Sequence, residues 1–308
     1  MKKNIPIFLT LLVVITISVF VIVQKKEQQT EPLVAKKMHN ILSTKSCVKP
    51  PQFLKSLHIP QPVLIDLSQK QFKGIAFFYG KKFQKVLHAK QWETFGALGT
   101  YSLDKKGNLY LVPMPYISIE KKTFQQQKSI YKLDSQTGKL SIFLTLKDVF
   151  PSANNPYGIQ AITYDCSDET LWVSAIDESN YQSQKGKIYH IDIKNKKIIE
   201  TVSGIDALSL HIVNATNGKF LLVGSARYNK LYAYALNKNT KVQYPAQELF
   251  TLPLHTEHIR KIKIHKEKIE LQVIPFTYTL IAQTGKEDRV YYQAIWNKIN
   301  KKWQFSKK

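Results

Sequence analysis

Residues 104–112 read DKKGNLYLV, and this stretch decides the fold because its pattern occurs four times along the chain. A polar turn segment leads into an alternating apolar run, and the other three copies are 165–173 (DCSDETLWV), 214–223 (NATNGKFLLV) and 265–273 (HKEKIELQV). Gly and Asn tolerate the positive φ that tight hairpins need, and alternation is typical of half-buried strands. Each copy therefore predicts two antiparallel strands joined by a hairpin.

A second pattern, an aliphatic residue followed by tyrosine, comes after each hairpin, at 129–132 (SIYK), 187–190 (KIYH), 230–233 (KLYA) and 289–292 (RVYY). Turn-rich segments follow the first three copies and predict another hairpin, at 133–140, 191–198 and 236–242. Each unit thus holds four antiparallel strands, with the tyrosine pattern in the third. We expect four equivalent tyrosines to pack between neighbouring units: Tyr131, Tyr189, Tyr232 and Tyr291.

Repeated four-stranded units of this kind predict an all-β fold, a β-propeller, whose blades bury their faces by stacking around a central axis. No amphipathic helical stretch of about 10 to 15 residues separates the strands, which disfavours barrels and doubly wound sheets with parallel strands. Residues 60–90 supply further strands. We predict five four-stranded blades, or six if these N-terminal strands complete a blade begun at the C-terminus.

The repeats resemble a known group of proteins. Residues 99–112 look like the strand-turn-strand of the NHL and SMP-30/gluconolactonase-like propellers, and 156–174 with 186–192 are similar to one of their blades. The resemblance covers about residues 95 to 295. For gluconolactonase-like members it implies a divalent ion held by a glutamate at the start of an inner strand, a Pro-Asn-Gly asparagine and a later aspartate. Leu98 and Tyr157 stand at the first two positions, so the full metal-ligand set is missing.

The N-terminus predicts a membrane anchor. Residues 5–23 carry no charge and follow Lys2 and Lys3, and bulky residues at 20–23 replace the small residues that a cleavage site needs. Lysines flank both sides, but a short N-terminal flank normally stays inside. We therefore expect a single-pass signal anchor at 1–24, a polar tether at 25–58 and a propeller domain at 59–308 that faces the periplasm or the cell exterior.

The chain is strongly basic, with 45 Lys and Arg against 22 Asp and Glu in 308 residues, a net charge of +23. Only Arg227, Arg260 and Arg289 are arginine, whereas phosphate recognition favours the guanidinium fork. Nucleic acid is therefore a disfavoured partner. A solvated lysine surface is the first interpretation, and an anionic envelope polymer or lipid surface is the alternative.

Polar side chains in the loops that lead into the innermost strands should gather at one mouth of the channel. The candidates for binding a ligand are Asn154, Asn155, Tyr157, Asp206, His255, Glu257, His258 and Arg260. Oxygen-rich Asn and Asp suit Ca²⁺, and the histidines with the glutamate suit a transition metal. The run His255-Thr-Glu-His258 is too short for the helical zinc motif. Ordinary turn and loop roles explain the same residues.

Two classes of function fit these observations. The first is a membrane-tethered extracytoplasmic module for binding or scaffolding, without chemistry of its own. The alternative is a lactonase- or esterase-type hydrolase, in which a divalent ion in the channel polarises an ester carbonyl and activates water.

The chain has two cysteines, Cys47 in the predicted tether and Cys166 in a predicted hairpin turn. An even number outside the cytoplasm permits a disulfide, which would pin the tether onto the propeller. Two unpaired thiols are the alternative, since the sequence does not show that the tether reaches that end of the blade.

Overall fold

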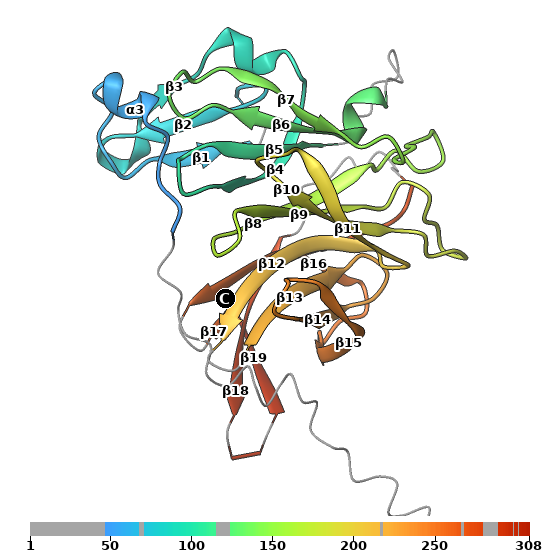
Figure 1. The fold of residues 1–308 in the computed structure, drawn as a ribbon. Coiled ribbons are helices and arrows are strands. Elements are labelled where there is room, and N and C mark those ends of the chain that lie inside the picture. The colour runs from blue at the N-terminus through green and yellow to red at the C-terminus, as the bar shows by residue number, and fades with distance from the viewer. Residues whose placement is uncertain are drawn as a thin grey trace, which may run out of the picture.

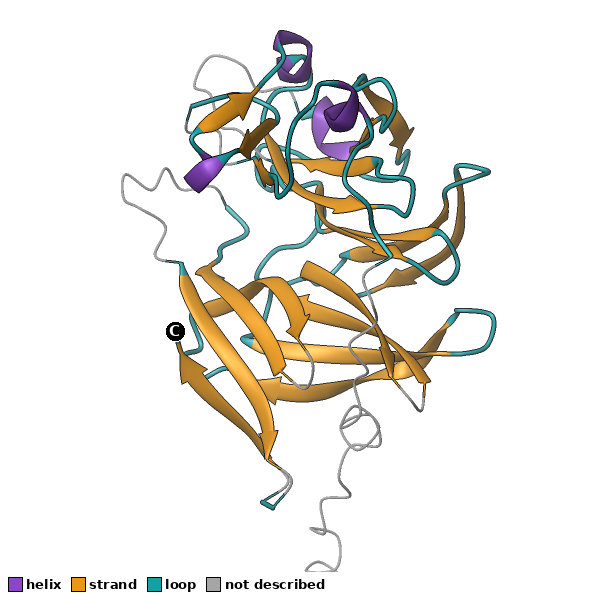
Figure 2. Ribbon diagram, turned by 90° about the vertical axis from the view of Figure 1, so that its left-hand side faces the viewer, coloured by secondary structure: helices purple, strands orange, loops and turns teal. Residues whose placement is uncertain are grey.

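The computed structural model describes residues 47–67, 71–114, 124–215, 218–265, 268–279, 289–297, 299–300 and 302–308. Five antiparallel sheets surround a central axis, so the protein is a five-bladed propeller, as predicted (Figure 1). Helix within these residues is limited to four short elements: α3 (Phe53–Ser56) and the 3-10 turns η1 (Lys81–Phe83), η2 (Lys90–Glu93) and η3 (Gln125–Lys128). Figure 2 shows how strongly strands dominate the body.

Each blade is built from consecutive strands. Blade 1 contains β1 (Leu64–Asp66), β2 (Ala76–Tyr79) and β3 (Lys85–Leu87). Blade 2 contains β4 (Leu98–Leu103), β5 (Leu109–Pro113), β6 (Ser129–Leu133) and β7 (Leu140–Thr145). Blade 3 contains β8 (Ile159–Asp165), β9 (Thr170–Ala175), β10 (Lys187–Asp192) and β11 (Lys197–Ser203).

Blade 4 contains β12 (Ala207–Ala215), β13 (Gly218–Ser225), β14 (Lys230–Leu236) and β15 (Val242–Thr251). Blade 5 contains β16 (Glu257–His265), β17 (Lys268–Pro275), β18 (Val290–Asn297) and β19 (Lys302–Lys307). No sheet of the described chain mixes strands from its two ends, so the six-blade alternative is wrong. The N-terminal strands form their own sheet, which has three described strands rather than four.

The apolar faces of successive blades pack together, as the alternating pattern requires. One hydrophobic cluster lies between blades 1 and 2, and three others lie between blades 2 and 3, 3 and 4, and 4 and 5. Tyr131 and Tyr189 of the tyrosine pattern are fully buried there, as expected. In blade 5 the expectation is wrong: Tyr291 is 46% exposed and Tyr292 is buried, because adjacent strand residues face opposite sides and the register there is one residue later.

The segment at 47–59 does not behave as the tether that we expected up to residue 58. Phe53, Leu54 and Ile59 are buried in the cluster between blades 1 and 2. The backbone N–H of Phe53 donates to the carbonyl oxygen of Ser135 at 2.8 Å. The sequence looks polar, yet a few apolar residues suffice to hold the segment because each buried large side chain contributes about 1.5–3 kcal/mol. We call residues 47–59 the strap.

A disulfide fixes the first residue of the strap, Cys47. Cys47 is joined to Cys166 in the turn between β8 and β9, with 6.1 Å between their Cα atoms. The strap therefore crosses the hairpin ends of blades 2 and 3. The predicted anchor and the tether up to residue 46 lie outside the described residues. Within the described part of the chain, no helix is long and apolar enough to cross a membrane.

Candidate functional site

The four complete blades share one irregularity at the start of the innermost strand. The pairing register with the second strand shifts between Leu98 and Thr100, Ile159 and Ala161, Ala207 and Ser209, and Ile259 and Lys261. Each shift leaves one extra residue on the inner strand, a β-bulge, and the four bulge residues are Gly99, Gln160, Leu208 and Arg260. A bulge bends its strand, leaves the extra residue out of the hydrogen-bond ladder and changes the direction of its side chain. Here they form a ring of backbone around the channel.

Arg260 spans this ring. Its Nη1 donates to the carbonyl oxygens of Gln160 at 3.2 Å and Leu208 at 3.1 Å, so one guanidinium connects the bulges of blades 3, 4 and 5. A Cβ placed on Gly99 would lie 3.5 Å from its Nη2, which brings blade 2 into the same contact. The sequence predicts Arg260 at the channel mouth, and the structure places its side chain across the ring, where it contacts Gln160 and Leu208.

The ring of carbonyls does not fit a divalent cation in the way the resemblance implies. Carbonyl oxygens are suitable calcium ligands, but two of them already accept bonds from a fixed positive charge. A dication beside that guanidinium would be repelled. Leu98, at the position where the resemblance implies a glutamate, is fully buried in the apolar cluster between blades 1 and 2.

Asp206 is fully buried just before β12, and all four of its hydrogen bonds come from protein donors. Its Oδ1 accepts from the hydroxyl of Ser179 at 2.5 Å and from the backbone N–H of Gly186 at 2.9 Å. Its Oδ2 accepts from the hydroxyl of Tyr278 at 2.5 Å and from Nη2 of Arg227 at 3.3 Å. Burial, followed by the bond to Asp206, raises the pKa of Tyr278. Asp206 therefore ties the loops of three blades together and has no oxygen left for a cation.

The asparagines and the tyrosine before β8 have different roles. Asn155 is buried, and its side-chain amide donates to the carbonyl oxygens of Ile176 at 2.5 Å and Ser179 at 2.7 Å. Asn154 is exposed. The ring of Tyr157 packs on Phe276 of blade 5, with 5.1 Å between ring centroids. These residues line and stiffen the same end of the propeller as Asp206.

His255, Glu257 and His258 do not converge. His255 is exposed, while Glu257 is buried and accepts a bond from the hydroxyl of Tyr292 at 3.1 Å. The ring of His258 packs against Phe276, and burial lowers its pKa although the carbonyls of Ser225 and Tyr228 partly oppose this. The described residues contain no group of three or more His, Cys, Asp or Glu side chains placed to hold a metal.

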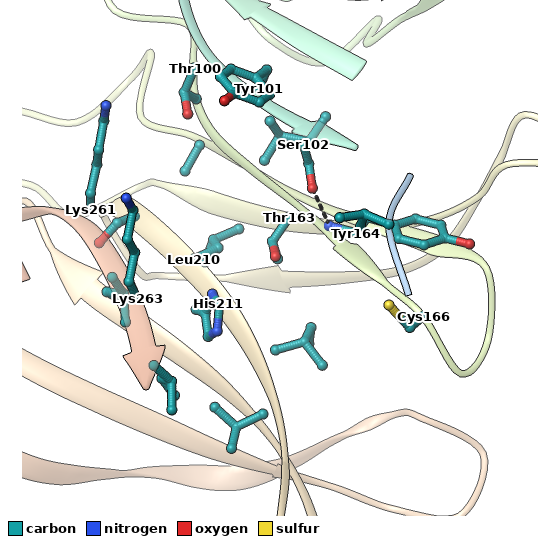
Figure 3. A pocket seen from close by; sticks show the side chains of 18 of the residues that line it. Thr100, Tyr101, Ser102, Thr163, Tyr164, Cys166, Leu210, His211, Lys261 and Lys263 are labelled. Carbon is teal, nitrogen blue, oxygen red and sulfur yellow. Dashed lines mark hydrogen bonds between the residues drawn. The ribbon is translucent and has the colours of Figure 1, made fainter. Parts of the chain in front are cut away.

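Next to the ring lies a chamber of about 560 Å³, lined by residues from the inner strands of all five blades. Figure 3 shows lining residues from blades 2 to 5. Arg260 lines the chamber at the ring. Val48 of the strap and Cys166 in the turn between β8 and β9 line it as well. Its polar lining comes from inner strands of blades 2 to 5: Thr100, Ser102, Thr163, Ser209, His211, Asn214, Lys261 and Lys263. Burial lowers the pKa of His211 to about 4, so its imidazole is neutral near pH 7.

The sequence predicts the polar residues at the channel mouth, but it does not predict the chamber or the residues that line it. Lys261 and Lys263 were hidden among many lysines, although their spacing of two on an inner strand places both on one face. His211 stands alone in an apolar run, which normally indicates an ordinary core residue. Arg227 and Tyr278, the partners of Asp206, could not be found because their loops meet it only in three dimensions.

The sequence matches no protein-family model and no curated protein. Solved structures with a similar fold include hydrazine synthase from Kuenenia stuttgartiensis, at 11% identity and a TM-score of 0.45, covering 80% of this chain and 62% of that one. Virginiamycin B lyase from Staphylococcus aureus is similar at 15% identity and 0.39, over 67% and 59%. A glucose dehydrogenase is similar at 13% and 0.41, over 73% and 76%. The chain spans less than two thirds of the first two proteins. At these identities the likeness concerns the fold alone.

Proposed function

We propose that this protein is a membrane-tethered binding module on the outer side of the cytoplasmic membrane, and that it takes a small ligand in the chamber of its propeller. The observation that carries the proposal is the chamber itself, which residues from the inner strands of all five blades line between the Arg260 ring and the strap. Ligand sites are typically concave, largely preformed and lined by apolar surface with a few polar groups. The chamber is concave, and polar and apolar side chains both line it.

The location rests on two features of the chain. Residues 5–23 are uncharged and long enough to span a bilayer. The disulfide between Cys47 and Cys166 supports an oxidising compartment, because such bonds are rare in the cytosol.

The hydrolase alternative is less well supported. It requires a divalent ion in the channel, and the place where the inner strands converge is occupied by the guanidinium of Arg260. Of the two carboxylates among the candidates, Asp206 already accepts bonds from Ser179, Gly186, Tyr278 and Arg227. Glu257 accepts a bond from Tyr292 and belongs to no group of three or more His, Cys, Asp or Glu side chains among the described residues that could hold a metal.

Thermal unfolding of the detergent-solubilised full chain tests the proposal. The probes are octanoate and its uncharged match octanamide, since both are small enough for the chamber, with Ca²⁺ and Zn²⁺ in parallel. A ligand that binds only the folded state raises the melting temperature by mass action. We expect a saturable rise with at least one organic probe and none with either ion.

Two variants locate the binding. Thr163→Phe fills the chamber from β8, and Thr201→Phe makes the same change on the exposed outer strand β11. The rise should disappear in the first variant and persist in the second. A saturable rise with Ca²⁺ or Zn²⁺ alone would favour the hydrolase instead.

A further inference from the structure

The chamber wall has an unbalanced charge. Among the described residues that line it are Arg260, Lys261 and Lys263, and none is a carboxylate. Asp66 at the end of β1 is the one acidic group close enough to favour the charged form of Lys261. A low-dielectric cavity lined by one sign of charge concentrates its field, and this attracts ions of the opposite sign.

The two lysines are the available cations of this wall. Arg260 is committed to backbone carbonyls. Lys261 and Lys263 extend from the same strand, β16, and Figure 3 shows their side chains running in the same direction beside the cavity. Within the described part of the chain, no carboxylate oxygen lies within 4.0 Å of either ammonium group, whereas Lys187, Lys219 and Lys230 on other strands do form such pairs.

Repulsion among the positive charges of Arg260, Lys261 and Lys263 destabilises the folded protein when no ligand is bound. Burial lowers the pKa of Lys261, and the charges of Arg260, Arg289 and Lys263 lower it further. Lys261 is exposed to solvent and also lines the chamber, so part of its side chain is available to a ligand there. Groups kept in a strained electrostatic environment are typical of binding sites, because stability there is traded for function.

The rest of the wall suits an organic body. Leu210 and Ile212 of β12 and Ile262 of β16 line the chamber together with the hydroxyls of Thr100 and Thr163. We propose that the chamber binds a small organic anion whose acid group contacts Lys261 and Lys263 and whose apolar body lies against β12. This inference rests on the proposed function and names its ligand class.

The experiment compares octanoate, octanamide and inorganic phosphate on the full chain in detergent, by thermal unfolding and by titration calorimetry at constant ionic strength. The variants are Lys261→Gln with Lys263→Gln together, and the matched control Lys238→Gln, an exposed lysine in the turn between β14 and β15. A charge-assisted contact typically changes affinity by roughly tenfold or more. We expect octanoate to bind at least about tenfold more tightly than octanamide, and the double variant to remove that difference.

The same variants distinguish a ligand contact from a structural role. Without ligand, the double variant should melt at a higher temperature than the wild type, because it removes repulsion among three cations. The control Lys238→Gln should change neither the melting temperature nor the difference in affinity between octanoate and octanamide. A structural role would lower the melting temperature instead. Equal affinity for octanoate and octanamide, with both lost in Thr163→Phe, would overturn the anion inference and leave the binding module standing. No saturable binding of any probe would contradict both.

Discussion

Arg260 in blade 5 donates to the carbonyl oxygen of Leu208 in blade 4 at 3.1 Å, and both residues are the extra residue of a β-bulge. The bulge turns each of these groups toward the channel instead of leaving it in the sheet ladder. Neighbouring hydroxyls use the carbonyls before the bulges: Ser174 donates to Ala207 at 2.9 Å and Ser209 to Ile259 at 2.7 Å. Repeated bulges therefore join the blades around the chamber.

Replacing Arg260 tests the importance of the ring. Arg260→Met keeps an apolar stem but removes the donors to Gln160 and Leu208, so the free energy of unfolding should fall by about 1–3 kcal/mol. Urea unfolding measures the change, with Lys238→Met as the control at an exposed turn. If the two variants unfold at the same urea concentration, the ring has no structural role.

Asp206 should be the most sensitive residue at the channel mouth. In Asp206→Asn, one oxygen becomes an amide group that faces the donors of Ser179 and Gly186 or of Tyr278 and Arg227. Breaking a buried ion pair costs about 3–5 kcal/mol. A melting temperature as high as that of Asp192→Asn, at the partly exposed end of β10, would show that Asp206 is dispensable for stability.

The stability of the propeller should decrease below neutral pH. His190 is buried against Trp172, with 4.0 Å between ring centroids, and burial lowers its pKa from 6.5 to about 4. Between these values the unfolded chain binds a proton that the folded chain does not, so stability falls as the pH decreases through this window. His190 alone should contribute about 2 kcal/mol to the loss at pH 5, and His211, whose pKa is lowered in the same direction, should add to it.

Urea unfolding at pH 7 and pH 5 measures this loss. His190→Gln should make the dependence shallower, whereas His255→Gln, at an exposed position, should leave it unchanged. An equal pH dependence in wild type and His190→Gln would mean that other groups cause it.

The fold could be predicted from the sequence because the turn residues and the alternating strands indicate the same hairpins that the packing between the blades requires. The turn at 104–108 has a glycine at φ 86°, and the alternating strand that follows is buried in two clusters. The strap could not be recognised, because its apolar residues, which include the buried Phe53, Leu54 and Ile59, follow no sustained period among lysines and prolines. The site was harder still: Asp206 was found as a polar residue in the expected loop, but its partner Arg227 comes from another loop of blade 4 and its partner Tyr278 comes from blade 5.

The disulfide should stabilise the propeller by fastening the strap. The two cysteines are 119 residues apart, and the chain-entropy account gives roughly 4–5 kcal/mol for closing a loop of that size. We expect Cys166→Ser to unfold at a lower urea concentration than the wild type. Mass spectrometry of a non-reduced digest should give a peptide pair that joins Cys47 to Cys166, and ready alkylation of both thiols in the native protein would show the opposite.

The anchor predicts the topology of the chain in the membrane. Because residues 5–23 lack small residues at their end, the protein should keep its N-terminus and sediment with membranes. Protease added outside the cytoplasmic membrane should digest the propeller. A mature form that begins near residue 24 would contradict the anchor.

The central claim is that the chamber between the Arg260 ring and the strap holds a ligand, and a crystal structure of the full chain with octanoate tests it most directly. The account predicts octanoate in the chamber, with its carboxylate within about 4 Å of the ammonium groups of Lys261 and Lys263 and its chain beside Leu210 and Ile212. Octanoate bound only on the outer strands, with water filling the chamber, would contradict it.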